Sequence, residues 1–260
     1  MVKRALATID TPDDPAGPAD AGEAASRTLI ERAYLQLRED ILDGRLAPGA
    51  RLRVEHLKHD YGVGAGTLRE AITRLATDAL VVAEGQRGFR VAPMALDDLI
   101  DLTELRIHIE IDALRRSIRK ADASWRARVV AAFQALSAFE QPVSPEVARQ
   151  WEQLNQGFHA TLVSGCDSPW TLRVLHQLHQ HGERYRRYAI GLPDTGRDVH
   201  SEHLQIFEFA LAGQDARAAL ALEAHIRATP DLLARHPHEG FGALARPEMR
   251  RLAARSPDPS

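Results

Sequence analysis

Apolar residues at helical spacing predict three short helices near the start of the chain. The apolar stripe of the first helix, with steps of four, three and four residues, consists of Ile30, Tyr34, Leu37 and Ile41. Pro48 and Gly49 end this pattern, because proline lacks a backbone donor and glycine tolerates the turn. A second helix is predicted over residues 54–61 and a third over residues 65–80, with a Gly-Val-Gly corner at residues 62–64 between them.

A hairpin is predicted directly after the third helix. Residues 80–84 and 89–92 are two β-prone runs, and the segment between them is bounded by Gly85 and Gly88. Helix, corner, helix and hairpin in this order predict a winged helix-turn-helix over residues 27–93, in which the helix after the corner enters the major groove of DNA. The alternative is a small helical domain with an ordinary hairpin.

Several polar side chains of such a module would face the duplex. The free N–H groups at the start of the third helix, together with Thr67, suit a phosphate, and the hairpin tip can reach a minor groove or a phosphate. The residues predicted to contact double-stranded DNA are Arg51, Arg53, Thr67, Arg69, Arg74, Gln86 and Arg87.

The remainder of the chain has a helical pattern and no credible strand. Breaks at Pro142, Gly165, Pro193 and Gly213 divide it into predicted helices over residues 96–120, 124–139, 145–163, 169–190, 197–212 and 216–234. Short connections favour an antiparallel helical bundle over residues 96–233, so the fold class is mainly α. Residues 1–26 and 234–260 are expected to be a disordered arm and a flexible tail.

Histidines on three of these helices are the candidate chemistry. Asn155 and His159 are four residues apart and share a helix face, while His203 and His225 lie on later helices, so all could converge inside the bundle. The plainer interpretation is that each histidine is a separate core or surface side chain. His200, one turn from His203, is an alternative to it. A further cluster of His176, His179 and His181 has the pattern of a solvated face.

Composition narrows the classes of function. A net charge of −3 excludes a bulk polycation, so any basic surface must be local, as in a dimeric repressor. The single cysteine, Cys166, excludes an internal disulfide and a cysteine-rich zinc site, and fits the reducing cytosol. The chain contains no apolar run of membrane-spanning length and no signal-peptide core, so we expect a cytoplasmic protein without a membrane partner.

Residues 46–52, 62–64, 67–72 and 88–91 resemble the GntR family of bacterial transcription regulators. The rest resembles the all-helical FCD effector-binding domain of the branch with fatty-acid-responsive and lactate-responsive regulators, and the two resemblances cover roughly residues 29–233. One motif departs from the family pattern. The usual Ser-Arg-Thr-Pro is replaced by residues 64–67, so the base-reading arginine expected at Ala65 is missing. Base recognition must then depend more on Thr67, Arg69 and the wing.

The resemblance implies a divalent metal site. The branch carries Asp-x-x-Phe-His, then Glu-His, then a late histidine, and relatives hold the metal with the aspartate and three histidines. The ligands implied for this chain are Asn155, His159, His203 and His225. His203 is preferred to His200 because it follows Glu202 as in the family. Asn155 stands where the family has aspartate and is a weaker, neutral ligand. Three neutral imidazoles fit zinc or nickel, and manganese is a further candidate.

The resemblance also implies a small carboxylate effector. An arginine at the place of Arg106 often faces the cavity in the family; the alternative is a surface ion pair with Glu110. Arg184 and Tyr188 are further candidates for effector binding. The Phe-His-Ala-x-x-Val-x-Gly-Cys run at residues 158–166 resembles regulators of glutarate catabolism, which suggests a dicarboxylate.

These observations together predict a repressor that binds a palindromic operator as a homodimer and responds to the carboxylate. A metal-dependent hydrolase would need a general base beside the metal. The chain lacks His-Glu-x-x-His, and Glu202 is the only acid directly beside a proposed ligand. An architectural DNA-binding protein, with neither effector nor metal, is the third possibility.

Overall fold

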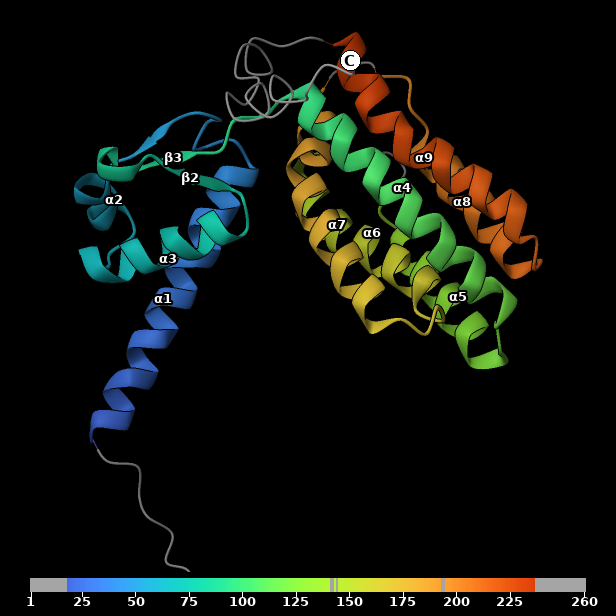
Figure 1. Ribbon diagram of the computed structural model, residues 1–260, viewed down its shortest axis with the longest axis horizontal. Helices are drawn as coiled ribbons and strands as arrows, with labels where there is room; N and C mark the ends of the chain where they lie inside the picture. Colours follow the sequence, from blue (N-terminus) through green and yellow to red (C-terminus); the bar gives the residue numbers. More distant parts are fainter. Residues whose placement is uncertain (1–17, 141–142, 144, 193–194, 237–260) are drawn as a thin grey trace, which may run out of the picture.

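The computed structural model describes residues 18–140, 143, 145–192 and 195–236, and, within these ranges, side chains from residue 27 onward except those of Gln86 and Pro145. The chain folds into an N-terminal module with three helices and a small sheet, followed by a helical bundle (Figure 1). This confirms the predicted fold class. None of the helices in the described part of the chain combines the length and the apolar character needed to cross a bilayer.

The N-terminal module consists of α1 (Pro18–Leu42), α2 (Val54–Asp60) and α3 (Ala65–Thr77) with β1 (Arg51–Leu52), β2 (Val81–Ala83) and β3 (Phe89–Val91). The strands form an antiparallel sheet in the order β1-β3-β2, in which Arg90 lies opposite Arg51 on one side and Val82 on the other. A short 3-10 turn, Gly85–Arg87, forms the tip of the wing. Tyr34, Leu37 and Ile41 of the stripe predicted for the first helix, together with Ala33, pack in one core with Leu68, Ile72 and Leu75 of α3. Ile30, the first residue of that stripe, is not part of this cluster.

Three local expectations for this module need correction. Helix α1 begins at Pro18, so residues 18–26 are helical and not part of a disordered arm; residues 1–17 lie outside the described part. Helix α3 ends at Thr77 because Ala79 takes a positive φ of 54° and turns the chain into β2. Strand β1 was not predicted, since two residues are too few to show an alternating pattern.

The bundle contains α4 (Leu96–Arg119), α5 (Ala123–Ser137), α6 (Ala148–Val163), α7 (Pro169–Ile190), α8 (Val199–Leu211) and α9 (Asp215–Arg235). Asp122, Ser168 and Asp198 accept hydrogen bonds from backbone N–H groups in the first turns of α5, α7 and α8, which explains where these helices begin. Helix α4 packs against α6, α7 and α9. Helix α9 continues to Arg235, slightly beyond its predicted end; most of the predicted tail, residues 237–260, lies outside the described part.

The apolar core of the bundle surrounds the inner faces of these helices. Leu114, Phe158, Leu162, Ile206 and Leu222 are all at most 1% exposed and belong to one cluster. Because they come from α4, α6, α8 and α9, this cluster fixes how the four helices face one another.

Leu114→Ala should destabilise the protein by about 2–5 kcal/mol, since it removes a fully buried side chain and leaves a cavity. Leu220→Ala is the matched control, because Leu220 on α9 is 68% exposed, and its effect should stay within about 0.5 kcal/mol. Urea unfolding followed by circular dichroism measures both. Equal losses would contradict this assignment of the core.

Candidate metal centre and DNA-binding surface

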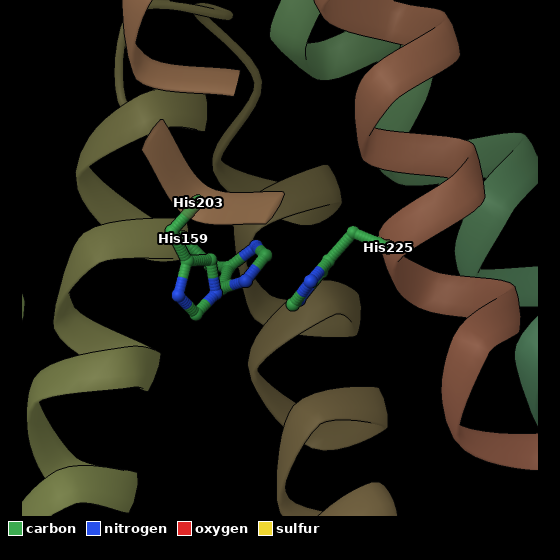
Figure 2. A group of neighbouring side chains, drawn as sticks. All are labelled: His159, His203 and His225. Atoms are coloured by element: carbon green, nitrogen blue, oxygen red, sulfur yellow. The ribbon is translucent and has the colours of Figure 1, made fainter. Parts of the chain in front are cut away.

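Three imidazoles from three helices meet inside the bundle. His159 extends from α6, His203 from α8 and His225 from α9, and Figure 2 shows their rings gathered in the space between these helices. Each offers one nitrogen, and these three atoms lie within 4.8 Å of one another. All three side chains are buried. The structure therefore brings together the three histidines implied as ligands.

Each of these imidazoles is held by a carboxylate on its Nδ1 side. His159 Nδ1 lies 2.9 Å from Glu110 of α4. His203 Nδ1 lies 2.6 Å from Glu140, just after α5. His225 Nδ1 lies 2.7 Å from Glu202 of α8. A carboxylate accepts the Nδ1 proton, which leaves the Nε2 lone pair of a neutral imidazole for a metal ion.

The Nε2 atoms have the environment that a metal ion would complete. Those of His159 and His203 are buried and, within the described part of the chain, have no hydrogen-bond partner. Such unpartnered buried nitrogens are costly unless something binds them. The histidine and glutamate groups could thus hold a divalent cation, and the donor set fits one.

Asn155 lies one turn before His159 on α6 and is 1% exposed. Its Oδ1 is buried and has no partner among the described residues. An amide oxygen in this position could serve as a neutral fourth ligand, so the assignment of Asn155 stays a prediction.

Burial keeps the imidazoles of His159 and His225 neutral. It lowers the pKa of His159 to about 3, against the opposing effect of Glu110, and lowers the pKa of His225 well below its usual value. Burial alone would raise the pKa of Glu110, but Arg106 and His179 beside it lower that pKa well below its usual range. Neutral imidazoles facing an ionised carboxylate are the protonation states that metal binding needs.

A second group of potential ligands, Glu110, His159 and His179, supports the first. Glu110 accepts from Arg106 Nε at 2.6 Å and lies 3.2 Å from His179 Nε2, in addition to its contact with His159. Because a guanidinium and two imidazole nitrogens already surround this carboxylate, we interpret the group as outer support for His159. A separate cation there would lie against the charge of Arg106.

His179 is the site residue that the sequence analysis missed. It is 5% exposed, whereas its predicted companion His176 is exposed and contacts Gln156 and Gln180. The pattern Leu175, Leu178, Gly182 around it, with buried residues three and four apart, is the signal that could have placed His179 on the inner face of α7.

A cavity of about 540 Å³ adjoins the histidine centre. Its polar lining includes His200, His225, Arg106, Arg186 and Arg197, and its apolar lining includes Trp151, Val143 and Ile226. The Arg106–Glu110 pair lies in this buried interior and is not a surface ion pair. His200 lines the cavity and contacts Glu140 at 3.4 Å, but it is not a member of the ligand group.

Arg184 and Tyr188 are not among the residues that line this cavity, and their role in effector binding stays a prediction. Positions 184 and 188 lie two residues on either side of Arg186, and residues two apart on a helix do not face the same way. Arg186 takes the expected place in the cavity. Arg184 and Tyr188 instead line a cavity between α7 and the N-terminal module.

Four of the predicted DNA contacts meet on the N-terminal module. A surface groove of about 400 Å³ between β1, α3 and the wing tip is lined by Arg51, Arg53, Arg69 and Arg87. Thr67 is half-buried in the first turn of α3, outside this lining. The side chain of Gln86 lies outside the described part of the structure.

Arg74 is separated from these four. Its guanidinium pairs with Glu31 of α1 and lies 4.0 Å from the ring centre of Tyr34. Helix α3 packs against α1 at this position, so Arg74 lies outside the lining of the groove, and its role as a DNA contact stays a prediction.

A winged helix with an arginine-lined groove, joined to a helical bundle with a buried histidine centre, is the architecture of a DNA-binding regulator. Residues 29–91 match the family of bacterial regulatory proteins, gntR family, and residues 101–228 match the FCD domain. The chain therefore belongs to the GntR family of transcriptional regulators, which bind DNA and typically act as dimers.

Individual relatives agree with this assignment. The HTH-type transcriptional regulator BphR of Paraburkholderia xenovorans (strain LB400) is 44% identical over 206 residues, 78% of this chain and 84% of BphR. The HTH-type transcriptional repressor GlaR of Escherichia coli (strain K12) is 31% identical over 198 residues, 74% of this chain and 90% of GlaR. These families and relatives are transcription regulators, so they give no support to the hydrolase alternative.

Solved structures show the same fold. A GntR regulator from Rhodococcus sp. RHA1 superposes with a TM-score of 0.64 over 80% of this chain and 98% of its own, at 22% identity. McbR/YncC of E. coli gives a TM-score of 0.62 over 81% and 99%, at 18% identity.

His203→Ala should abolish metal binding, because it removes one of three converging nitrogens, whereas the wild type should carry about one ion per chain. Elemental analysis of protein purified with added zinc measures this. His200→Ala is the matched control, since His200 is on the same helix as His203 and lines the adjoining cavity but is outside the ligand group. Metal retained by His203→Ala, or lost equally from His200→Ala, would reject the site.

Proposed function

We propose that this protein is a metal-containing transcriptional repressor that binds a palindromic operator as a homodimer and responds to a small dicarboxylate. The observation that carries the proposal is the convergence of three carboxylate-supported imidazoles beside a cavity lined by guanidinium groups. The name of the relative GlaR as a repressor supports the sign of regulation.

The arginine-lined groove supports binding to duplex DNA. Since the helix after the corner enters the major groove in a winged helix, Arg69 on α3 would contact that groove, and Arg87 at the wing tip would contact the neighbouring backbone or minor groove. Arg51 and Arg53 are suited to phosphate contacts, which position a protein without reading the sequence. Two such modules related by the symmetry of a dimer would match the two halves of a palindrome.

The cavity supports an anionic ligand. Arg106, Arg186 and Arg197 line it, and each contacts a carboxylate of the chain itself: Glu110, Glu152 and Glu202, respectively. A ligand with two carboxylates could place one at the histidine end and the other at these guanidinium groups. A zinc, nickel or manganese ion held by His159, His203 and His225, with Asn155, would supply a Lewis-acidic contact for the first carboxylate.

The same contacts weaken the case for hydrolysis. Glu110, Glu140 and Glu202 all accept hydrogen bonds from the imidazoles that would hold the metal ion. A carboxylate that fixes a ligand in this way is poorly suited to serve as the general base for an attacking water.

Arg69→Ala should weaken operator binding by about 1–3 kcal/mol, because it removes a side chain placed to read the major groove. In vitro selection with the full-length wild type would first provide the operator, which should be palindromic. Arg74→Ala is the matched control on the same helix, since Arg74 is tied to Glu31 and Tyr34. Fluorescence anisotropy at fixed salt measures both affinities. An equal effect of the two substitutions would count against the groove, and a selected site without two-fold symmetry would count against the dimer.

Four- to six-carbon dicarboxylates should raise the melting temperature of the zinc-loaded protein, because a ligand bound to the folded state stabilises it by about 2.7 kcal/mol at about 100 times its Kd. Arg106→Gln should lose the response, since it removes a charged group that lines the cavity. Arg227→Gln, which changes an arginine paired with Glu104 and Glu223 outside the cavity, should keep it. Differential scanning fluorimetry measures the melting temperatures, with the matching monocarboxylates as ligand controls. A response retained in Arg106→Gln would remove that residue from the site.

A further inference from the structure

Helix α7 lies between two cavities and contributes residues to the lining of each. Its residues Arg186 and Ala189 line the cavity beside the histidines. Its residues Arg184, Arg187 and Tyr188 line a larger cavity, of about 1270 Å³, that is bounded on the other side by the end of α1 and the turn after it. The two sets belong to different faces by helical spacing. A single helix of 22 residues thus contacts both the proposed effector site and the DNA-binding module.

On the face toward the effector cavity, Arg186 is bound to Glu152 of α6. Its Nε lies 3.0 and 3.2 Å from the two carboxylate oxygens of Glu152, and its Nη2 donates to the backbone oxygen of His179 at 2.8 Å. Both charged side chains are buried. The guanidinium lies over Gly182, where an added Cβ would be 2.7 Å from Arg186 Nη1. Arg186 can take this position only because residue 182 has no side chain.

On the other face, Arg187 is bound to α1 of the DNA-binding module. Its Nη1 donates to Glu39 and to Asp43, both at 2.9 Å, and its Nη2 lies 2.7 Å from Glu183. Glu183 in turn pairs with Arg38 of α1. We name this group the α1–α7 latch; it consists of Arg38, Glu39, Asp43, Glu183 and Arg187.

The same part of α7 also holds the linker between the two domains. Arg184 Nη2 donates to the backbone oxygen of Ala92 at 3.1 Å and to that of Pro93. Tyr185 donates to the backbone oxygen of Ala95 at 3.3 Å. Four consecutive residues, 184–187, therefore contact the linker, α1 and the cavity.

We propose that α7 transmits the state of the effector cavity to the DNA-binding domain, with the Arg186–Glu152 pair as the sensor and the α1–α7 latch as the output. The identity of the ligand rests on the proposed function. An anionic ligand in the cavity competes with Glu152 for Arg186. Arg186 then has two arrangements, one on Glu152 and one on the ligand, which is the kind of two-state element that a ligand can bias. A change in the position of the helix at residue 186 also acts on Arg184 and Arg187, because they are adjacent on the same rigid element.

Hydrogen–deuterium exchange of the full-length protein, read by mass spectrometry without added ligand, tests this. Arg187→Gln should speed exchange in peptides covering residues 36–46 and 91–96, since it removes the centre of the latch. Gly182→Ala should speed exchange in the same peptides although residue 182 lies on the cavity side, because its new Cβ displaces Arg186. Arg173→Gln, an exposed position near the start of α7, should leave both peptides at wild-type rates.

Wild-type exchange in Arg187→Gln would reject the latch. Wild-type exchange of these peptides in Gly182→Ala would reject the connection to the cavity. If Gly182→Ala loses its helical circular dichroism, Glu152→Gln replaces it, because it removes the charge that holds Arg186 without adding volume, and the same two outcomes decide.

The failure of this proposal is distinguishable from that of the proposed function. The exchange experiment needs neither metal nor carboxylate, so it can succeed when the dicarboxylates do not bind. Conversely, dicarboxylates that stabilise the protein while Gly182→Ala and Glu152→Gln leave the latch peptides unchanged would support the effector site and reject the coupling.

Discussion

The pairing of buried charges determines how this bundle is built. Glu110, Glu140 and Glu152 are at most 5% exposed, and ionised carboxylates are expensive to bury without partners. Each meets nitrogen donors from other positions on the inner surface: Arg106 and His159 for Glu110, His203 for Glu140, and Arg186 for Glu152. Removal of one partner leaves the other as an unpaired buried group. The requirement for mutual pairing therefore fixes α6 against α4 and α7, and α8 against the end of α5, and the cavity follows from that placement.

The contact between the two domains is polar, whereas the core of each domain is apolar. The winged-helix module closes an apolar core of its own around Leu37, Leu68 and Ile72. Its contact with α7 is instead made by ion pairs and by hydrogen bonds to linker carbonyls. Polar contacts between domains permit relative motion more readily than a shared apolar core does. The chain thus combines a bundle with a closely packed interior and a polar connection between the domains.

Local signals allowed much of this fold to be predicted from the sequence. The Gly62–Gly64 corner and Pro169 mark where one helix ends and the next can begin. Helices α3 and α7 therefore start where the sequence pattern indicates. The spacing of Asn155 and His159 placed both on the inner face of α6. The contacts between side chains of different helices depend on tertiary packing, and the sequence was not sufficient to predict them. Glu140 as the partner of His203, and Arg186 in place of Arg184, depend on how the helices rotate about their axes, and a shift of two residues moves an arginine from one cavity to the other.

The amide of Asn155 has a consequence for how the site would work. The family resemblance implies an aspartate at this place, which would supply a negative charge directly to the ion. An imidazole binds a metal ion in its neutral form, and an amide carries no charge. In this chain the nearest carboxylates are engaged with Nδ1 atoms or with guanidinium groups. The charge of a divalent cation would then be balanced at contact distance only by an anionic ligand. Binding of the cation and binding of the carboxylate should therefore strengthen each other, since a coupling free energy acts equally in both directions. An aspartate at position 155 would weaken this dependence, so that the amide makes the occupancy of the histidine centre itself sensitive to the effector.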